Sequence, residues 1–177
     1  MIKNKFVYEL DIDLDMEYIT NLVMNKQNES VKGRAGHHRM VKDDPYMASL
    51  LNRYPLLSPV YNIYPMPPHI GIPLHIDTDR SCALNIPIEG TENTHTIFYS
   101  AGEDIVLEHD SKRIYDLVKS PVNEVYRHTL IRPLLINNTT PHEVTNNKNS
   151  KRITISWSFQ KGVTFEQAIR CFNEPVL

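Results

Sequence analysis

The stretch Pro73-Leu74-His75-Ile76-Asp77 decides how the rest of this chain is interpreted. It places a histidine and an aspartate two positions apart, and a second histidine, His142, follows far downstream. Two imidazoles and one carboxylate on one face of a metal ion leave the remaining coordination positions open to other ligands. The sequence therefore predicts a metal centre, provided that His75, Asp77 and His142 meet in the folded chain.

The residues around this stretch alternate in the manner of short strands separated by turns. Strands are expected at 60–64, 81–88, 94–100, 104–108, 124–128, 132–137, 142–146 and 152–159. Residues 109–120 fit either a helical turn or a long loop, and 137–141 and 146–150 are turn-forming. Many short antiparallel strands predict a mainly β fold, either a sandwich or the double-sheet jelly roll that cupins share.

The two ends of the chain predict flanking helices. A strand over 4–12 precedes a helix from about Met16, a second short helix begins at Asp44-Pro45, and a third begins at Thr164. The polar residues 25–43, which include His37 and His38, are predicted to form a loop. We expect one domain over 1–177, with a β-roll core at about 60–160 and helices covering the outer face of one sheet.

The last predicted strand divides into two unlike faces, because side chains alternate along a strand. One face carries Ile153, Ile155, Trp157 and Phe159, and the other carries Arg152, Thr154, Ser156 and Ser158. Burial of each large apolar side chain contributes about 1.5–3 kcal/mol, so we expect the apolar face under the helices. The polar face then points either to solvent, as is usual in an antiparallel sheet, or into the roll. In the interior an arginine requires an anion.

Composition restricts the partners and the compartment. The net charge of −2 gives no electrostatic footprint for nucleic acid. No apolar run approaches the about 18 residues of a membrane helix, and the N-terminus lacks the apolar segment of a signal peptide. We therefore expect a cytoplasmic protein. Cys82 and Cys171 form no CxxC pair and are expected to be small apolar residues outside any disulfide or zinc framework.

His75-Ile76-Asp77, His142 and Arg152 together resemble the signature of the Fe(II)/2-oxoglutarate-dependent oxygenases. That superfamily has a double-stranded β-helix fold and an H-x-D/E … H motif, with a basic residue about ten positions after the second histidine. An arginine at the last position is most similar to the aspartyl/asparaginyl β-hydroxylase-like and phytanoyl-type branches. Because the carboxylate is present, where related halogenases have a small residue, the resemblance implies hydroxylation.

The resemblance also implies the roles of individual residues. His75, Asp77 and His142 would bind Fe(II), and Arg152 would pair with the distal carboxylate of the co-substrate 2-oxoglutarate. Oxygen would occupy the remaining position, and turnover would release succinate and carbon dioxide. The metal and the co-substrate would carry the chemistry, while the protein orients them and excludes water.

Further candidates follow from position in the expected strands. Tyr64 and Thr154 supply hydroxyls that co-substrate sites in this superfamily often use, against plain structural roles. Asn85 lies among apolar neighbours and either orients a ligand or the co-substrate or satisfies backbone groups, and the latter is slightly favoured. Arg80 either binds an anionic substrate group or pairs with Asp79. The other histidines considered, His69, His95, His109 and His128, are expected to be loop, core or surface residues, and Glu143 is expected to point away from His142.

Two other functions remain open at this point. One is a cupin-like metal enzyme that works without 2-oxoglutarate, and the other is a non-catalytic β-roll binding module. The direction of the Arg152 side chain separates the first alternative from the oxygenase. The substrate is expected to be a small molecule or a peptide side chain, and the sequence predicts no oligomeric state.

Overall fold

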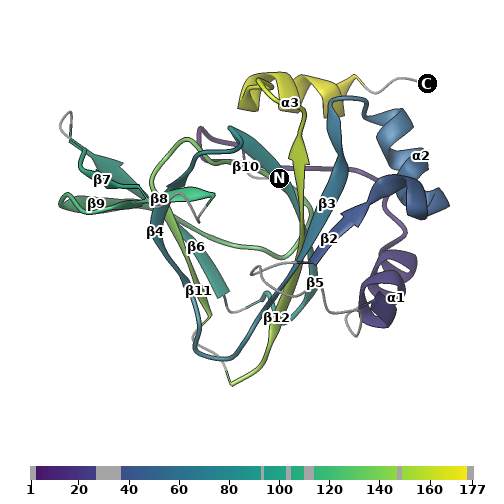
Figure 1. The fold of residues 1–177 in the computed structure, drawn as a ribbon, viewed down its shortest axis with the longest axis horizontal. Coiled ribbons are helices and arrows are strands. Elements are labelled where there is room, and N and C mark those ends of the chain that lie inside the picture. Colours follow the sequence, from purple (N-terminus) through teal and green to yellow (C-terminus); the bar gives the residue numbers. More distant parts are fainter. Residues whose placement is uncertain are drawn as a thin grey trace.

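The computed structural model describes residues 3–26, 37–92, 94–102, 105–109, 114–146 and 149–174, which form two facing β-sheets with helices on one side (Figure 1). Sheet A contains, in spatial order, β1 (Val7–Glu9), β10 (Leu134–Asn137), β5 (Cys82–Glu89), β12 (Arg152–Phe159), β3 (Leu57–Met66) and β2 (His37–Met40). Sheet B contains β7 (Leu107–Glu108), β8 (Tyr115–Val118), β4 (Ile72–Asp77), β11 (His142–Asn146), β6 (Thr94–Ala101) and β9 (Val122–Thr129).

Successive strands alternate between the two sheets from β3 to β6 and again from β9 to β12. The chain passes from β3 in sheet A to β4 in sheet B, back to β5 and again to β6, and it repeats this crossing through β10, β11 and β12. All pairings within the sheets are antiparallel. This winding is that of a double-stranded β-helix, as expected from the sequence.

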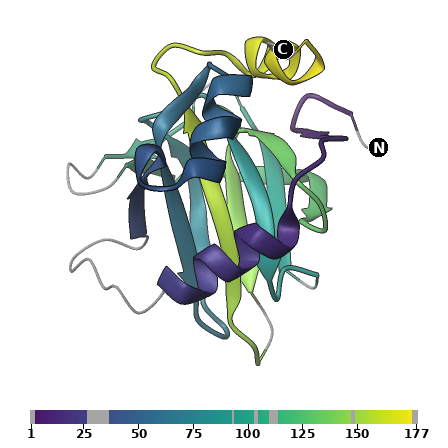
Figure 2. The ribbon, with the colours of Figure 1, turned by 90° about the vertical axis from the view of Figure 1, so that its right-hand side faces the viewer.

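The helices lie against the outer face of sheet A (Figure 2). They are α1 (Met16–Lys26), α2 (Pro45–Arg53) and α3 (Phe165–Asn173), with a short 3-10 turn, η1 (Val41–Asp43), before α2. Side chains cap the starts of the helices: Asp15 accepts from the backbone amide of Tyr18, and Asp44 accepts from that of Met47. Thr164 and Gln167 form the reciprocal capping box of α3. None of the helices in the described ranges is long and apolar enough to cross a membrane.

The two faces of β12 are separated as the alternation predicts. Ile153, Ile155, Trp157 and Phe159 belong to the core between sheet A and the helices, where they meet residues such as Ile19, Met47 and Phe172. The opposite face of β12 is therefore directed toward sheet B, into the interior of the roll. One end of that interior is filled by a smaller apolar cluster that includes Phe6, Phe98 and Leu134.

Several element predictions were wrong. Residues 109–120, assigned to a helical turn or a loop, contain the strand β8, which forms because it pairs with β4 and β7. The first strand is confined to Val7–Glu9, and His37 and His38 lie in β2 rather than in a loop, because β2 pairs with the edge of β3. Residues 27–36 of that predicted loop and residue 104 of a predicted strand lie outside the described residues.

Candidate metal centre

Two neighbouring strands of sheet B bring the predicted ligands together. β11 pairs with β4 so that His142 lies directly opposite His75, and Asp77 follows on the same face of β4. The imidazole centroids of the two histidines are 4.2 Å apart, and one donor atom from each of the three residues lies within 4.8 Å of the others. All three side chains are buried. Residues 67 positions apart in the sequence thus form one compact donor set.

Backbone carbonyls orient both imidazoles. Nδ1 of His75 lies 2.7 Å from the carbonyl oxygen of Pro73, and Nδ1 of His142 lies 2.9 Å from that of Thr140. A metal-binding histidine usually donates its second ring nitrogen to such a group, which fixes the tautomer and the ring orientation. Nε2 of each ring is then left to face the common centre, and Nε2 of His75 lies 3.4 Å from Oδ1 of Asp77.

The two oxygens of Asp77 have different surroundings. Oδ2 accepts a hydrogen bond from Nε of Arg80 at 2.8 Å and another from Nδ2 of Asn138. Oδ1 is directed toward the histidines. Oδ1 is therefore the oxygen available to a metal ion. Sequence reasoning did not identify Asn138, whose only signal was its place in the turn before His142.

Electrostatics keep Asp77 and His142 in the protonation states that bind a metal ion. Burial would raise the pKa of Asp77, but the hydrogen bond with His75 and the nearby charge of Arg80 outweigh burial and lower it, so the carboxylate is ionised. Burial lowers the pKa of His142 to about 4, so its imidazole is neutral at pH 7. Two imidazoles with one carboxylate suit divalent iron and leave positions open for further ligands.

Arg152 is a buried cation within the roll. Its side chain lies on the inner face of β12, is 5% exposed, and donates from Nε to Oγ1 of Thr94 on β6 at 3.0 Å. Burial lowers the pKa of Arg152 to about 10, and among the described residues no carboxylate pairs with it. A desolvated guanidinium without a counter-charge is costly, so this position favours an anionic ligand.

Three further candidates, predicted with weaker support, lie on the inner face of sheet A. Tyr64 lies opposite Thr154, and Asn85 lies opposite Ser156, on the inner faces of β3, β12 and β5. Oδ1 of Asn85 is buried without a hydrogen-bond partner, which removes the backbone-satisfying role favoured from sequence for that atom. Asn62, which sequence analysis did not single out, lies on the other side of Ser156 and also has a buried Oδ1 without a partner.

Arg80 spans the interior at the end of β4. Its Nε binds Asp77, whereas Oδ1 of Asp79 lies 3.9 Å from the same nitrogen, so the alternative pairing with Asp79 is the weaker contact. Nη1 donates to the hydroxyls of Ser156 at 3.3 Å and Ser158 at 3.2 Å. The predicted role of Arg80 in binding an anionic substrate remains a prediction, since these contacts are to protein groups.

The other titratable candidates lie apart from the donor set. His69 and His95 contact Asn149 and Thr129, and His109 pairs with Asp116. His128 is buried on β9, with Nε2 3.9 Å from Oε1 of Glu9. Glu143 accepts from the hydroxyl of Tyr99 and points away from His142, as expected. Cys82 and Cys171 are both free thiols.

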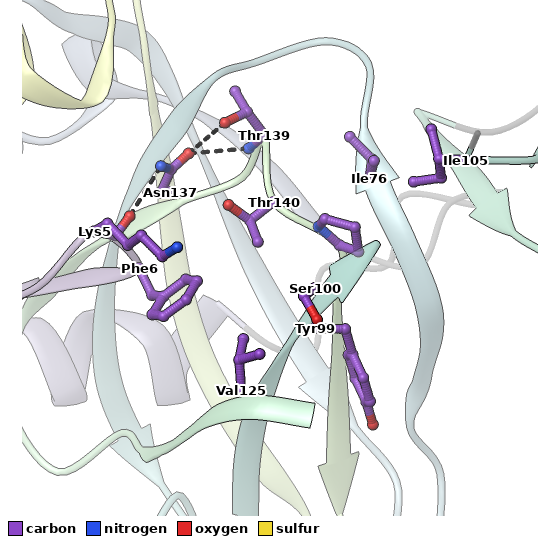
Figure 3. A pocket seen from close by; sticks show the side chains of 11 residues that line it. Lys5, Phe6, Ile76, Tyr99, Ser100, Ile105, Val125, Asn137, Thr139 and Thr140 are labelled. Atoms are coloured by element: carbon purple, nitrogen blue, oxygen red, sulfur yellow. Dashed lines mark hydrogen bonds between the residues drawn. The ribbon is translucent and has the colours of Figure 1, made fainter. Parts of the chain in front are cut away.

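A surface hollow of about 470 Å³ lies among β4, β6, β9 and the turn before β11 (Figure 3). It is lined by Ile76, whose side chain alternates with those of His75 and Asp77 and points to the other face of β4. Thr140 and Pro141, immediately before His142, also line it. None of the predicted site residues lines this hollow, so it is separate from the donor set.

Comparisons with known proteins support the fold. No protein-family model matches the chain, and no curated protein matches it in sequence. Among solved structures, it resembles AviO1 from Streptomyces viridochromogenes Tue57, with a TM-score of 0.52 and 13% identity over 90% of this chain and 91% of that one. It also resembles SnoK from nogalamycin biosynthesis, a non-heme alpha-ketoglutarate-dependent carbocyclase. That match has a TM-score of 0.51 and 14% identity over 93% of this chain and 86% of SnoK.

The likenesses establish a shared fold. At these identities they transfer neither an activity nor a substrate to this chain.

Proposed function

We propose that this protein is an Fe(II)- and 2-oxoglutarate-dependent dioxygenase that hydroxylates a small-molecule or peptidyl substrate and releases succinate and carbon dioxide. The convergence of His75, Asp77 and His142 supports the metal centre. The observation that carries the co-substrate is the buried, inward-facing Arg152 without a carboxylate partner among the described residues. The cupin-like and non-catalytic alternatives assign no role to that charge.

The residues of the chain divide the work between the two sheets. On sheet B, His75, Asp77 and His142 would hold the metal through Nε2, Oδ1 and Nε2. On sheet A, Arg152 would bind the distal carboxylate of 2-oxoglutarate by a charge-assisted, forked contact. Tyr64, Thr154 and Asn85 would orient the co-substrate between these points.

Bound iron with 2-oxoglutarate and oxygen supplies the oxidising power, and the chain positions these groups and limits water. The buried donor set provides such an environment. With no basic footprint in the composition, we propose no nucleic-acid substrate.

Anaerobic titration with Fe(II), with and without 2-oxoglutarate, tests this proposal. We expect a visible metal-to-ligand charge-transfer band only when both are present, because bidentate chelation of the metal by the 2-oxo acid creates that transition. On admission of air, slow uncoupled turnover is expected to yield succinate. A metal-binding protein that gives neither the band nor succinate would be a cupin-like enzyme of another kind, and a protein that binds no metal would be a binding module.

A further inference from the structure

Two donors that are not metal-ligand candidates, Arg80 and Asn138, both contact Oδ2 of Asp77, whereas Oδ1 lies toward His75. Oδ2 accepts from Arg80 and from Asn138, which reach it from the loop after β4 and from the turn before β11. Asn138 is itself fixed, because its backbone N–H donates to the backbone carbonyl of Ser81 at 2.9 Å. With Asp77 8% exposed, water has little access with which to replace either donor.

Arg80 is held in turn by the opposite sheet. Its side chain is 12% exposed, and Nη1 contacts the hydroxyls of Ser156 and Ser158 on β12. Asp77 belongs to sheet B and both serines belong to sheet A, so the guanidinium crosses the interior of the roll. A planar guanidinium fixed at Nε and Nη1 has little rotational freedom, unlike a lysine ammonium.

This arrangement restricts how Asp77 can bind a metal. Carboxylates bind metal ions through one oxygen or through both. Here, coordination through both oxygens would break the hydrogen bonds from Arg80 and Asn138 to Oδ2. The buried guanidinium of Arg80 would then lose its contact with the Asp77 carboxylate. Coordination through Oδ1 alone preserves these contacts and keeps one more position open on the metal.

We propose that Arg80 is a positioning residue of the metal centre, which fixes Asp77 as a one-oxygen ligand and ties that ligand to β12, the strand that carries Arg152. This inference rests on the metal half of the proposed function, and it does not depend on 2-oxoglutarate. Outer contacts of this kind typically change metal affinity by about 10–100-fold when they are removed.

The test uses Co(II) as a spectroscopic probe, bound to the full chain without oxygen or co-substrate. In Arg80→Met we expect the dissociation constant to rise about 10–100-fold and the visible ligand-field bands to shift, because Asn138 alone then holds Oδ2 of Asp77 and the carboxylate is less firmly oriented. Arg80→Lys retains the charge but cannot reach Asp77 and both serines together, so it should show the same band shift with a smaller loss of affinity. Arg127→Met, on the exposed outer face of β9, is the matched control and should leave both readouts unchanged.

The double variant Ser156→Ala/Ser158→Ala removes the serine contacts of Arg80 and leaves its ion pair with Asp77 in place. It retains Arg80 and is expected to shift the bands in the same direction with a smaller loss of affinity. If Arg80→Met does not fold, as judged by circular dichroism, this double variant decides the question.

Unchanged bands and affinity in the variants overturn the inference, and so does tighter Co(II) binding, which would mean that Arg80 only repels the cation. Failure of the wild-type chain to bind metal would instead overturn the proposed function.

Discussion

At the scale of single residues, the site depends on a few buried charges with unlike environments. Oδ2 of Asp77 accepts from two donors, and Arg152 has one hydroxyl partner and no carboxylate partner among the described residues. The first arrangement favours a cation added at Oδ1, and the second favours an added anion. The two side chains therefore call for different ligands, and each can be tested alone.

Replacement of Asp77 by alanine should abolish metal binding at stoichiometric concentration, because it removes the only charged donor of the set and leaves Arg80 with only its weaker carboxylate contact, to Asp79. Isothermal titration with Fe(II) or Mn(II) under nitrogen measures this. Asp43→Ala, at an exposed position of η1, is the control and should bind normally. Wild-type affinity in Asp77→Ala would remove Asp77 from the donor set.

Replacement of Arg152 by methionine should raise the 2-oxoglutarate concentration needed for half-maximal succinate formation by at least about tenfold, since a buried charge-assisted contact is worth about 1.5–3 kcal/mol. Iron affinity should be unchanged, because Arg152 contacts none of the three metal donors. Succinate assays across a 2-oxoglutarate series, with parallel metal titrations, separate the two effects. An unaltered requirement for the co-substrate would contradict the assigned role of Arg152.

At the scale of elements, β12 contributes both to the core under the helices and to the site in the interior of the roll. Its apolar face packs under the helices, while its polar face carries Arg152, Thr154 and the serines that hold Arg80. A slip of one residue in register would exchange these faces, so the helices and the strong pairing with β3 and β5 also fix the site. Stability and site geometry are linked through this strand.

The helix α3 allows its contribution to stability to be measured apart from the site. Thr164→Ala should lower the free energy of unfolding by about 1 kcal/mol, since the side-chain oxygen of Thr164 caps the amide of Gln167. Thr164→Ser retains that oxygen and should be close to wild type. Urea unfolding followed by tryptophan fluorescence measures both. Equal stability of all three proteins would mean that the cap contributes nothing.

At the scale of the whole molecule, a bound metal would cross-link distant segments. His75 and Asp77 lie on β4, His142 lies on β11, and Asp77 is tied through Arg80 to the other sheet. These contacts exist only in the folded chain, so metal binding should stabilise the fold.

The expected stabilisation is about 2.7 kcal/mol at a free metal concentration one hundred times the dissociation constant. Thermal unfolding with increasing Mn(II) tests this prediction. The midpoint temperature of unfolding should rise with the Mn(II) concentration, and addition of a chelator should reverse the rise. Asp77→Ala should show no rise. A metal-induced rise of equal size in that variant would place the metal elsewhere.

The outcome for individual elements shows which local signals were sufficient. β11, β12 and the start of α3 were predicted with correct or nearly correct bounds, because alternation, turn residues and a capping box mark them. β2 and β8 were missed because they are short and exist through pairing with β3 and with β4 and β7. The sequence of such a short strand has no clear alternation of apolar and polar residues from which it could be predicted.

The sequence by itself determined the mainly β class, the three candidate ligands and the two unlike faces of β12, because alternation and spacing are local properties of the chain. Only the tertiary structure decided that His142 lies opposite His75, that Arg152 is buried without a carboxylate partner in the described part of the chain, and that Arg80 and Asn138 hold one oxygen of Asp77. These facts depend on cross-strand register and on contacts between the sheets. No local pattern encodes them, because the contacting residues lie far apart in sequence.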